Sequence, residues 1–198
     1  MIKAVLFDCF SVLIGDATKA AVDELWHVSP EKAEQFRATT RAVDKGIISD
    51  EEGTTTQAEL LGLTRAEFLA LRQKGEVRNV ELIDYIKKSL KGNYKLALVS
   101  NISSRARLDE RFLPGELDEL FDSVIASGDI GAIKPQPEIY YLAAARLGIE
   151  PSEGVMLDDI EAFCTGARDV GMHAIHFKTT KQGIADLTAF LDRGGESY

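Results

Sequence analysis

The sequence of 198 residues is poor in cysteine and in long apolar runs. Its two cysteines, Cys9 and Cys164, indicate neither a disulfide framework nor a zinc site. No segment approaches the roughly 18 consecutive apolar residues of a transmembrane helix. The N-terminal MIKAVLFD carries too little positive charge for a secretory signal. We therefore expect a soluble, cytoplasmic protein.

Positive charge is also scarce, because 23 Lys and Arg residues face 32 Asp and Glu residues, a net charge of -9. Nucleic acids and anionic membranes are polyanions, so we expect neither as a partner. A small phosphate could still bind where a local site overrides the global field. With 45% hydrophobic residues, the chain can form one large domain, or a core with a modest insertion. The sequence does not indicate an oligomeric state.

Short apolar segments of strand length recur along the chain, at residues 4–7, 95–100, 123–127, 154–158 and 173–177. Most are nearly continuous rather than alternating, which is typical of strands buried on both faces. Helical patterns separate several of them, at residues 80–92, 137–148 and 162–171. This alternation predicts an α/β fold, with a Rossmann-like parallel sheet and right-handed crossovers.

Residues 15–78 break the alternation, since they contain helical patterns and no convincing strand. We expect four short helices there, with first or capping residues Thr18, Ser29, Ser49 and Thr64. Trp26 and Phe36 lie on apolar faces and are expected in the core of these helices, although the face over the site could include one of them. The sequence thus predicts a small helical cap at 15–78, inserted into an α/β core of residues 1–14 and 79–198.

Polar residues follow four of the predicted strands: Asp8, then Ser100 and Asn101, then Lys134, then Asp158 and Asp159. In open parallel sheets the reactive site lies at the carboxyl ends of the strands. Clustered carboxylates repel one another unless a cation lies among them, and hard oxygen ligands suit Mg²⁺. A lysine and hydroxyl and amide donors add an anion pocket. The set predicts phosphoryl transfer to a nucleophilic carboxylate.

The segments FDCFSVL, LVSN, KPQPEIY and VMLDDIEAFCTGARDVGM resemble, in order and spacing, the four motifs of the haloacid dehalogenase superfamily of hydrolases. The resemblance covers nearly the whole chain, and the predicted cap is similar to the C1 type of that superfamily. Within it, the chain most resembles the phosphatase domain of soluble epoxide hydrolases and bacterial sugar-phosphate phosphatases.

The resemblance implies roles for the residues at the strand ends. Asp8 matches the nucleophile that forms an aspartyl-phosphate. Ser100 matches the hydroxyl that binds the transferring phosphoryl group, with help from Asn101. Lys134 matches the lysine that neutralises Asp8 and the phosphate.

The resemblance also implies a Mg²⁺ site. Asp8, the backbone carbonyl of Phe10 and Asp159 would supply its ligands. Asp158 would support them as a neighbour of Asp159 or as a partner of Lys134. The implied substrate is a small phosphorylated metabolite, such as a sugar phosphate.

Two positions depart from the pattern of the superfamily. Most of its phosphatases carry a second Asp two residues after the nucleophile, which protonates the leaving group and then activates water. Phe10 stands there in this chain and cannot move a proton, although such help is typically worth about 10²–10⁴-fold. We therefore expect slow turnover, or substrates such as sugar-1-phosphates and acyl phosphates. Phe163 likewise stands where many relatives have Asp or Asn.

Two alternatives to a Mg²⁺-dependent phosphatase stay open. A 2-haloacid dehalogenase would need no metal; such relatives carry an aromatic residue near position 10, but neutral polar residues in place of Asp158 and Asp159. A non-catalytic homologue that binds a phospho-ligand or a protein is motivated by Phe10 and Phe163.

Overall fold

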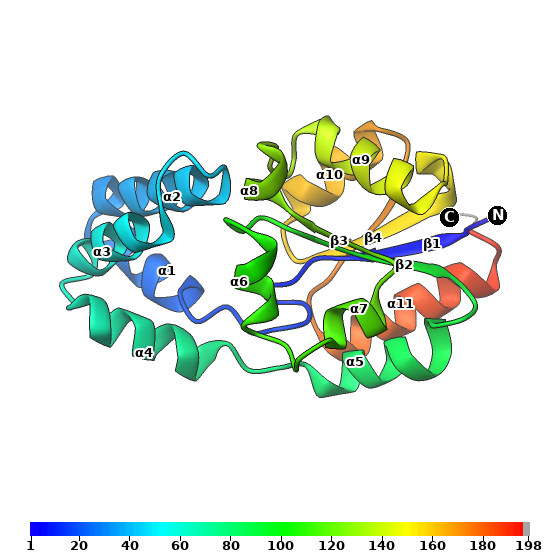
Figure 1. The fold of residues 1–198 in the computed structure, drawn as a ribbon, viewed down its shortest axis with the longest axis horizontal. Coiled ribbons are helices and arrows are strands. Elements are labelled where there is room, and N and C mark those ends of the chain that lie inside the picture. Colours follow the sequence, from blue (N-terminus) through cyan, green and yellow to red (C-terminus); the bar gives the residue numbers. More distant parts are fainter. Residues whose placement is uncertain (196–198) are drawn as a thin grey trace.

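The computed structural model describes residues 1–195, which form a five-stranded sheet flanked by helices (Figure 1). The strands are β1 (Ala4–Phe7), β2 (Lys95–Ser100), β3 (Ser123–Ala126), β4 (Gly154–Asp158) and β5 (His173–His176). They lie in the order β3-β2-β1-β4-β5, and every neighbouring pair is parallel. The predicted α/β fold with a Rossmann-like parallel sheet is confirmed, and each strand matches its prediction to within one residue.

Helices cover both faces of the sheet. One face is covered by α5 (Val80–Tyr85), its π-helical continuation (Ile86–Leu90), α6 (Arg105–Asp109), α7 (Glu116–Leu120) and α11 (Thr180–Asp192). The other is covered by α8 (Ser127–Ile130), α9 (Pro137–Leu147) and α10 (Glu161–Asp169), with a 3-10 turn at Pro151–Glu153. Strand β1 shows why both faces are apolar. Val5 and Phe7 pack into the first layer, whereas Ala4 and Leu6 pack into the second.

The structure contains helices that the sequence patterns did not predict. Three of them, α6, α7 and α8, have four or five residues each, too few to show a helical period. By contrast, α11 begins with a capping box between Thr179 and Gln182, a signal that the sequence does contain. The predicted helix over 80–92 changes to π-helical geometry from Ile86 onward.

The remaining helices form a separate group between β1 and α5, at the left of Figure 1. They are α1 (Lys19–Val28), α2 (Pro30–Asp44), α3 (Asp50–Leu60) and α4 (Arg65–Gly75). They bury an apolar cluster of their own, made of Val22, Phe36, Ala58 and Phe68. The rings of Phe36 and Phe68 meet edge to face with centroids 6.1 Å apart. The limits of a cap at residues 15 and 78 stay a prediction.

The four predicted residues stand at the N-cap positions of α1, α2, α3 and α4, but only two of them cap the helix with their side chains. Ser49 and Thr64 form complete capping boxes, as their hydroxyls accept hydrogen bonds from backbone amides three residues later. Ser29 precedes α2 but its side chain makes no cap hydrogen bond. Thr18 also makes none, because its backbone is already helical and its hydroxyl donates to Asp16.

The prediction that Trp26 belongs to the core of the four helices is wrong, whereas the same prediction for Phe36 is confirmed. Trp26 is 40% exposed, and its ring lies 4.6 Å from the guanidinium carbon of Arg37. The cation offsets the exposure of the indole face.

Both cysteines are buried and free, as packing residues would be. No helix within residues 1–195 has the length and apolar character needed to cross a membrane.

Asn79 fixes the point where the chain returns from the four helices to the sheet. Its side-chain amide nitrogen donates to the carbonyl of Val12 over 2.8 Å and to the hydroxyl of Thr180 over 2.9 Å. Its side-chain oxygen accepts from the backbone amide of Leu82, and its backbone amide donates to the carbonyl of Leu13. These bonds hold the loop after β1 against α5 and α11, so they also fix the loop that carries the first site residue.

We expect Asn79→Ala to lower the free energy of unfolding by about 2 kcal/mol, since a helix cap and two further hydrogen bonds are lost. Urea denaturation followed by circular dichroism measures this change. Asn93→Ala is the matched control, because exposed Asn93 makes one side-chain hydrogen bond, to Ser89. Its effect should stay within about 0.5 kcal/mol. Equal losses in both variants would contradict the role given to Asn79.

Candidate active site

Three carboxylates meet at the carboxyl ends of β1 and β4, which are neighbours in the sheet. Asp8 follows β1, and its amide donates to the carbonyl of Leu157 over 2.9 Å. Asp158 ends β4, and Asp159 comes next. Each of the three offers a carboxylate oxygen, and these oxygens lie within 4.8 Å of one another. The structure thus brings together the three acids that the sequence placed at one edge.

Lys134 lies between two of these acids. Its Nζ donates to Oδ1 of Asp8 over 2.7 Å and to Oδ2 of Asp158 over 2.6 Å, and its side chain is 0% exposed. The same Nζ lies 5.2 Å from the ring centroid of Phe163. Asn101 holds the backbone of the lysine, because its side chain donates to the carbonyl of Lys134 and accepts from the backbone amide of Lys134. The side chain of Asn101 is therefore a positioning group for the lysine.

Burial dominates the electrostatics of this cluster. It raises the pKa of Asp8 to about 7, with Lys134 opposing and Asp158 adding to the rise. Burial acts against the charge of Lys134 as well, but the carboxylates of Asp158 and Asp8 outweigh it and raise the lysine pKa above its usual range. The lysine thus stays charged, and a further cation beside Asp8 would favour its ionised form.

The chemistry of the donors fits Mg²⁺, which prefers carboxylate oxygens and usually takes one or two of them from the protein. Asp159 is 11% exposed in its side chain, and its Oδ2 accepts from Nζ of Lys19 on α1 over 2.9 Å. A metal held by Asp8 and Asp159 would share this carboxylate with Lys19 or displace it. The ligand role of the Phe10 carbonyl stays a prediction.

Ser100 lies at the end of β2 and is fully buried. Its Oγ has no hydrogen-bond partner among the residues that the structure describes. A buried hydroxyl without a partner costs about 1–3 kcal/mol, which a ligand oxygen would recover. Ser100 is not among the residues that line the cavity described next, whereas Asn101 is. Its contact with a phosphoryl group stays a prediction.

A cavity of about 570 Å³ lies between the acidic cluster and the four helices. Its lining is mostly apolar and includes Phe10 and Phe163 from the sheet side. Charged side chains of the helices also line it: Lys19, Asp23, Arg37, Arg41, Asp44, Asp50 and Arg72. Sequence reasoning missed these because it read functional residues from strand ends, and an amphipathic helix gives no equivalent signal.

The ring of Phe10, at the position of the missing second Asp, is held in a defined environment. It packs against the apolar layer that contains Val5 and Phe7, and it also lines the cavity. The guanidinium carbon of Arg111 lies 5.4 Å from the ring centroid. Arg111 in turn pairs with Glu76 over 3.0 Å. The residue at position 10 therefore cannot supply the proton that the missing Asp would give.

The model of the haloacid dehalogenase-like hydrolases matches residues 2–171. The chain therefore belongs to this family of hydrolases. It is 39% identical over 72 residues to bifunctional epoxide hydrolase 2 of Rattus norvegicus, a match that covers 36% of this chain and 13% of that protein. The chain thus spans a small part of that relative's length. It is 25% identical over 214 residues to phosphatase MT3486 of Mycobacterium tuberculosis (strain CDC 1551 / Oshkosh), with 98% and 99% of the two chains covered.

Solved structures of the family share the fold. A haloacid dehalogenase family enzyme from Bacteroides thetaiotaomicron, in complex with magnesium and inorganic phosphate, has a TM-score of 0.71 at 21% identity, over 91% of this chain and 96% of that one. A 2-haloacid dehalogenase from Pseudomonas syringae pv. Tomato DC3000 has a TM-score of 0.57 at 19% identity, over 89% and 86%. At these identities the likeness is one of fold, and the fold alone does not separate phosphatases from dehalogenases.

The raised pKa of Asp8 makes the metal-free protein sensitive to pH. A carboxyl whose pKa is raised by folding stabilises the folded state below about pH 4, and this contribution is lost as the pH rises through about 7. In EDTA, the free energy of unfolding should therefore fall between pH 5 and pH 8. Asp8→Asn should reduce this fall and raise the value at pH 8, on the order of 1–3 kcal/mol, since one pKa unit is worth about 1.4 kcal/mol.

Chemical denaturation at the two pH values measures this effect. Asp84→Asn is the control, because Asp84 lies on the surface and pairs with Lys88. It should change the free energy of unfolding by less than about 0.5 kcal/mol. A lower free energy of unfolding for Asp8→Asn at pH 8 would contradict this prediction. It would show that the ion pair of Asp8 with Lys134 stabilises the protein more than burial of the carboxylate destabilises it.

Proposed function

We propose that the protein is a Mg²⁺-dependent phosphatase that hydrolyses a small phosphorylated metabolite through an aspartyl-phosphate on Asp8. A sugar phosphate or a similar compound is the proposed substrate. The observation that carries this proposal is the buried contact of Lys134 with Asp8 and Asp158, at the base of a cavity that the four helices cover. Relatives named as phosphatases, and a structural neighbour that holds magnesium and phosphate, support it.

Each residue has a defined part in the proposed reaction. An oxygen of Asp8 attacks phosphorus while the bond to the leaving oxygen breaks. Lys134 holds Asp8 and binds the phosphoryl oxygens, and the Ser100 hydroxyl donates to one of them. Mg²⁺ held by Asp8 and Asp159, with the Phe10 carbonyl, would neutralise phosphoryl charge and favour the ionised nucleophile. Water then cleaves the aspartyl-phosphate, which releases phosphate and restores Asp8.

Residues 15–78 would act as the cap of this enzyme, with residues 1–14 and 79–198 as its catalytic core. All four helices contribute side chains to the lining of the cavity that also contains Asp8 and Asp159. A cover of this kind excludes bulk water from the reacting groups and selects the substrate. Charged side chains of these helices, such as Arg37, Arg41 and Arg72, also line the cavity and could contact polar parts of a substrate.

We expect the purified protein to release phosphate from at least one compound in a panel of sugar-1-phosphates, sugar-6-phosphates and acyl phosphates with Mg²⁺. Asp8→Asn should lower kcat by about 10³-fold or more, because the nucleophile is lost. EDTA should abolish activity, and added Mg²⁺ should restore it. Phosphate release measures all three effects, with Asp84→Asn as a control that keeps full activity. Hydrolysis that survives Asp8→Asn would overturn the proposal.

The two alternatives give different results in the same assays. A 2-haloacid dehalogenase would release halide from 2-haloacids in EDTA and would ignore Mg²⁺. Phe10 motivates this candidate, but Asp158 and Asp159 are both retained, which favours the phosphatase. A non-catalytic homologue would hydrolyse nothing in the panel, yet one phosphate ester would raise its Tm.

A further inference from the structure

The proposed reaction lacks a proton donor for the leaving group, and the structure suggests where one could come from. This inference rests on the proposed phosphatase function. Phe10 has no acidic proton, and the charged neighbour of its ring is Arg111. A donor must be a side chain that lines the cavity, is not fixed in an ion pair and is firmly placed.

Most carboxylates that line the cavity are already engaged. Asp16 accepts from Thr18, Asp50 pairs with Arg107, Asp159 pairs with Lys19, and Glu76 pairs with Arg72 and Arg111. Asp8 is the nucleophile, and Asp23 is an exposed residue. Asp44 differs from these groups. Within residues 1–195, its carboxyl makes no side-chain hydrogen bond and no ion pair, although it lines the cavity and is half-buried.

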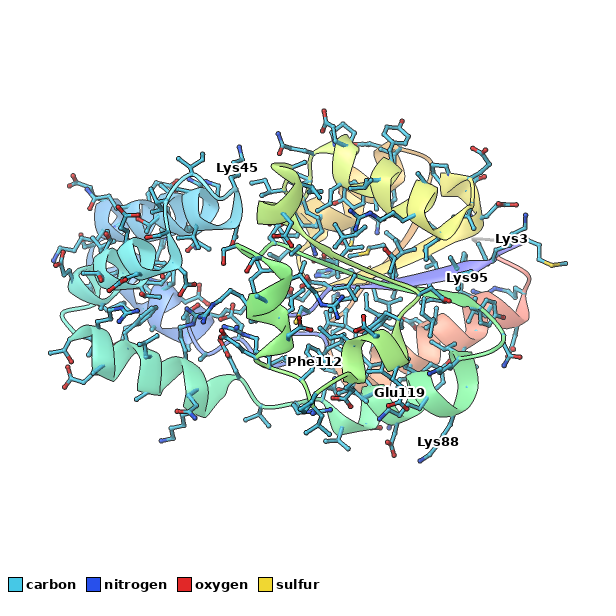
Figure 2. The ribbon with its side chains drawn as sticks, in the orientation of Figure 1. Lys3, Lys45, Lys88, Lys95, Phe112 and Glu119 are labelled. Carbon is cyan, nitrogen blue, oxygen red and sulfur yellow. The ribbon has the colours of Figure 1, made fainter. Side chains whose placement is uncertain are left out.

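The backbone of Asp44 is firmly placed, because α2 ends at this residue in contact with α8. The hydroxyl of Ser127, which is fully buried, donates to the carbonyl of Asp44 over 2.6 Å. The same hydroxyl accepts from the amide of Ile102 over 2.9 Å. Figure 2 shows Lys45, the next residue, where the end of α2 approaches α8. Asp44 is thus tied to the loops after β2 and β3, which also carry Asn101 and Lys134.

We propose that Asp44 is the general acid and base of the reaction, supplied by the cap in place of the acid that is missing at position 10. The assignment stands on its place in the cavity, its anchored backbone and its unpaired carboxyl. It makes Asp44 a catalytic residue that touches the leaving oxygen of the substrate.

The surroundings of Asp44 favour its protonated form. Burial raises its pKa to about 8, and the charges of Asp8 and Asp50 add to the rise, while Lys134 and Arg72 oppose it. A general acid works best with a pKa near the operating pH. Asp8 follows β1, Lys134 lies in the loop after α8, Asp50 belongs to α3 and Arg72 to α4, and all four line the same cavity as Asp44.

The protons balance over the two half-reactions. In the first, Asp8 bonds to phosphorus, the bond between phosphorus and the leaving oxygen breaks, and that oxygen takes the proton of Asp44. An alcohol leaves, and Asp44 is a carboxylate. In the second, Asp44 takes a proton from the water that attacks phosphorus, the bond to Asp8 breaks, and phosphate leaves. Asp44 is then protonated again and Asp8 is a carboxylate.

The test compares two probes that differ in their need for a proton. Phenyl phosphate expels a strongly basic phenolate, whereas acetyl phosphate expels weakly basic acetate. Asp44→Asn should lower kcat/KM for phenyl phosphate by about 10²–10³-fold and for acetyl phosphate by less than about threefold, because only the first reaction needs the acid. Glu31→Gln, an exposed change in the first turn of the same helix α2, should leave both values unchanged.

The pH profile gives a readout that a structural role would not move. For wild-type protein, kcat/KM for phenyl phosphate should fall above about pH 8, as Asp44 loses its proton. This limb should be absent with acetyl phosphate and absent in Asp44→Asn. Asp44→Glu should keep a limb of this kind, which also covers the case in which the Asn variant does not fold.

The outcomes separate the two proposals. Equal losses on both probes in Asp44→Asn would overturn the role of Asp44 and leave the phosphatase intact. So would wild-type protein that cleaves acetyl phosphate but not phenyl phosphate. Hydrolysis that persists in Asp8→Asn, or no hydrolysis of either probe by the wild type, would instead overturn the proposed function, and the role of Asp44 with it.

Discussion

The rest of the site depends on the contact between Lys134 and the acids at the ends of β1 and β4. Three carboxylates lie within 4.8 Å of one another, and Asp158 and Lys134 have no exposed side-chain surface. Buried charges of this kind are tolerated only when they are paired. Removal of Lys134 would leave two buried carboxylates without their cation, a change that typically costs about 3–5 kcal/mol. The lysine reaches two of the acids and is itself fixed through Asn101. An excess of negative charge nevertheless remains, which is the condition that favours a bound cation.

The strand order brings the acids together. Since β1 is flanked by β2 and β4, Asp8, Ser100 and Asp158 lie at the carboxyl ends of three neighbouring strands. Lys134 comes from the loop after α8 and reaches Asp8 and Asp158 from there. The turn after Asp8 is tight, because the amides of Leu13 and Ile14 both donate to the carbonyl of Cys9, and Ser11 has a positive φ of 60°. Few non-glycine residues adopt this conformation. The backbone strain is therefore located next to the proposed nucleophile, where such strain tends to occur.

The sequence predicted the sheet half of the site well, and it did so for a physical reason. Strands buried on both faces need continuous apolar runs, so a polar residue that ends such a run is conspicuous, as Asp8 and Asp158 are. The helical half gave no such signal. Asp44 looks like any polar residue at the end of an amphipathic helix, and only the tertiary structure shows that it lines the same cavity as Asp8 and Lys134. The prediction for Trp26 was wrong for the same reason, since an apolar helix face does not reveal whether another element covers it.

The proposed role of Asp44 also explains why an acid at position 10 would be poorly placed in this chain. Arg111 lies over the Phe10 ring and pairs with Glu76, so a carboxyl introduced there would meet a guanidinium. A neighbouring cation lowers the pKa of a carboxyl by about 1–3 units, which would leave it ionised and unable to donate a proton at neutral pH. Asp44 has the opposite environment, because burial and two like charges outweigh the cations around it. The proton is thus better supplied from the cap than from the loop after β1. Leaving-group protonation then depends on the hydrogen bond by which Ser127 holds the end of α2.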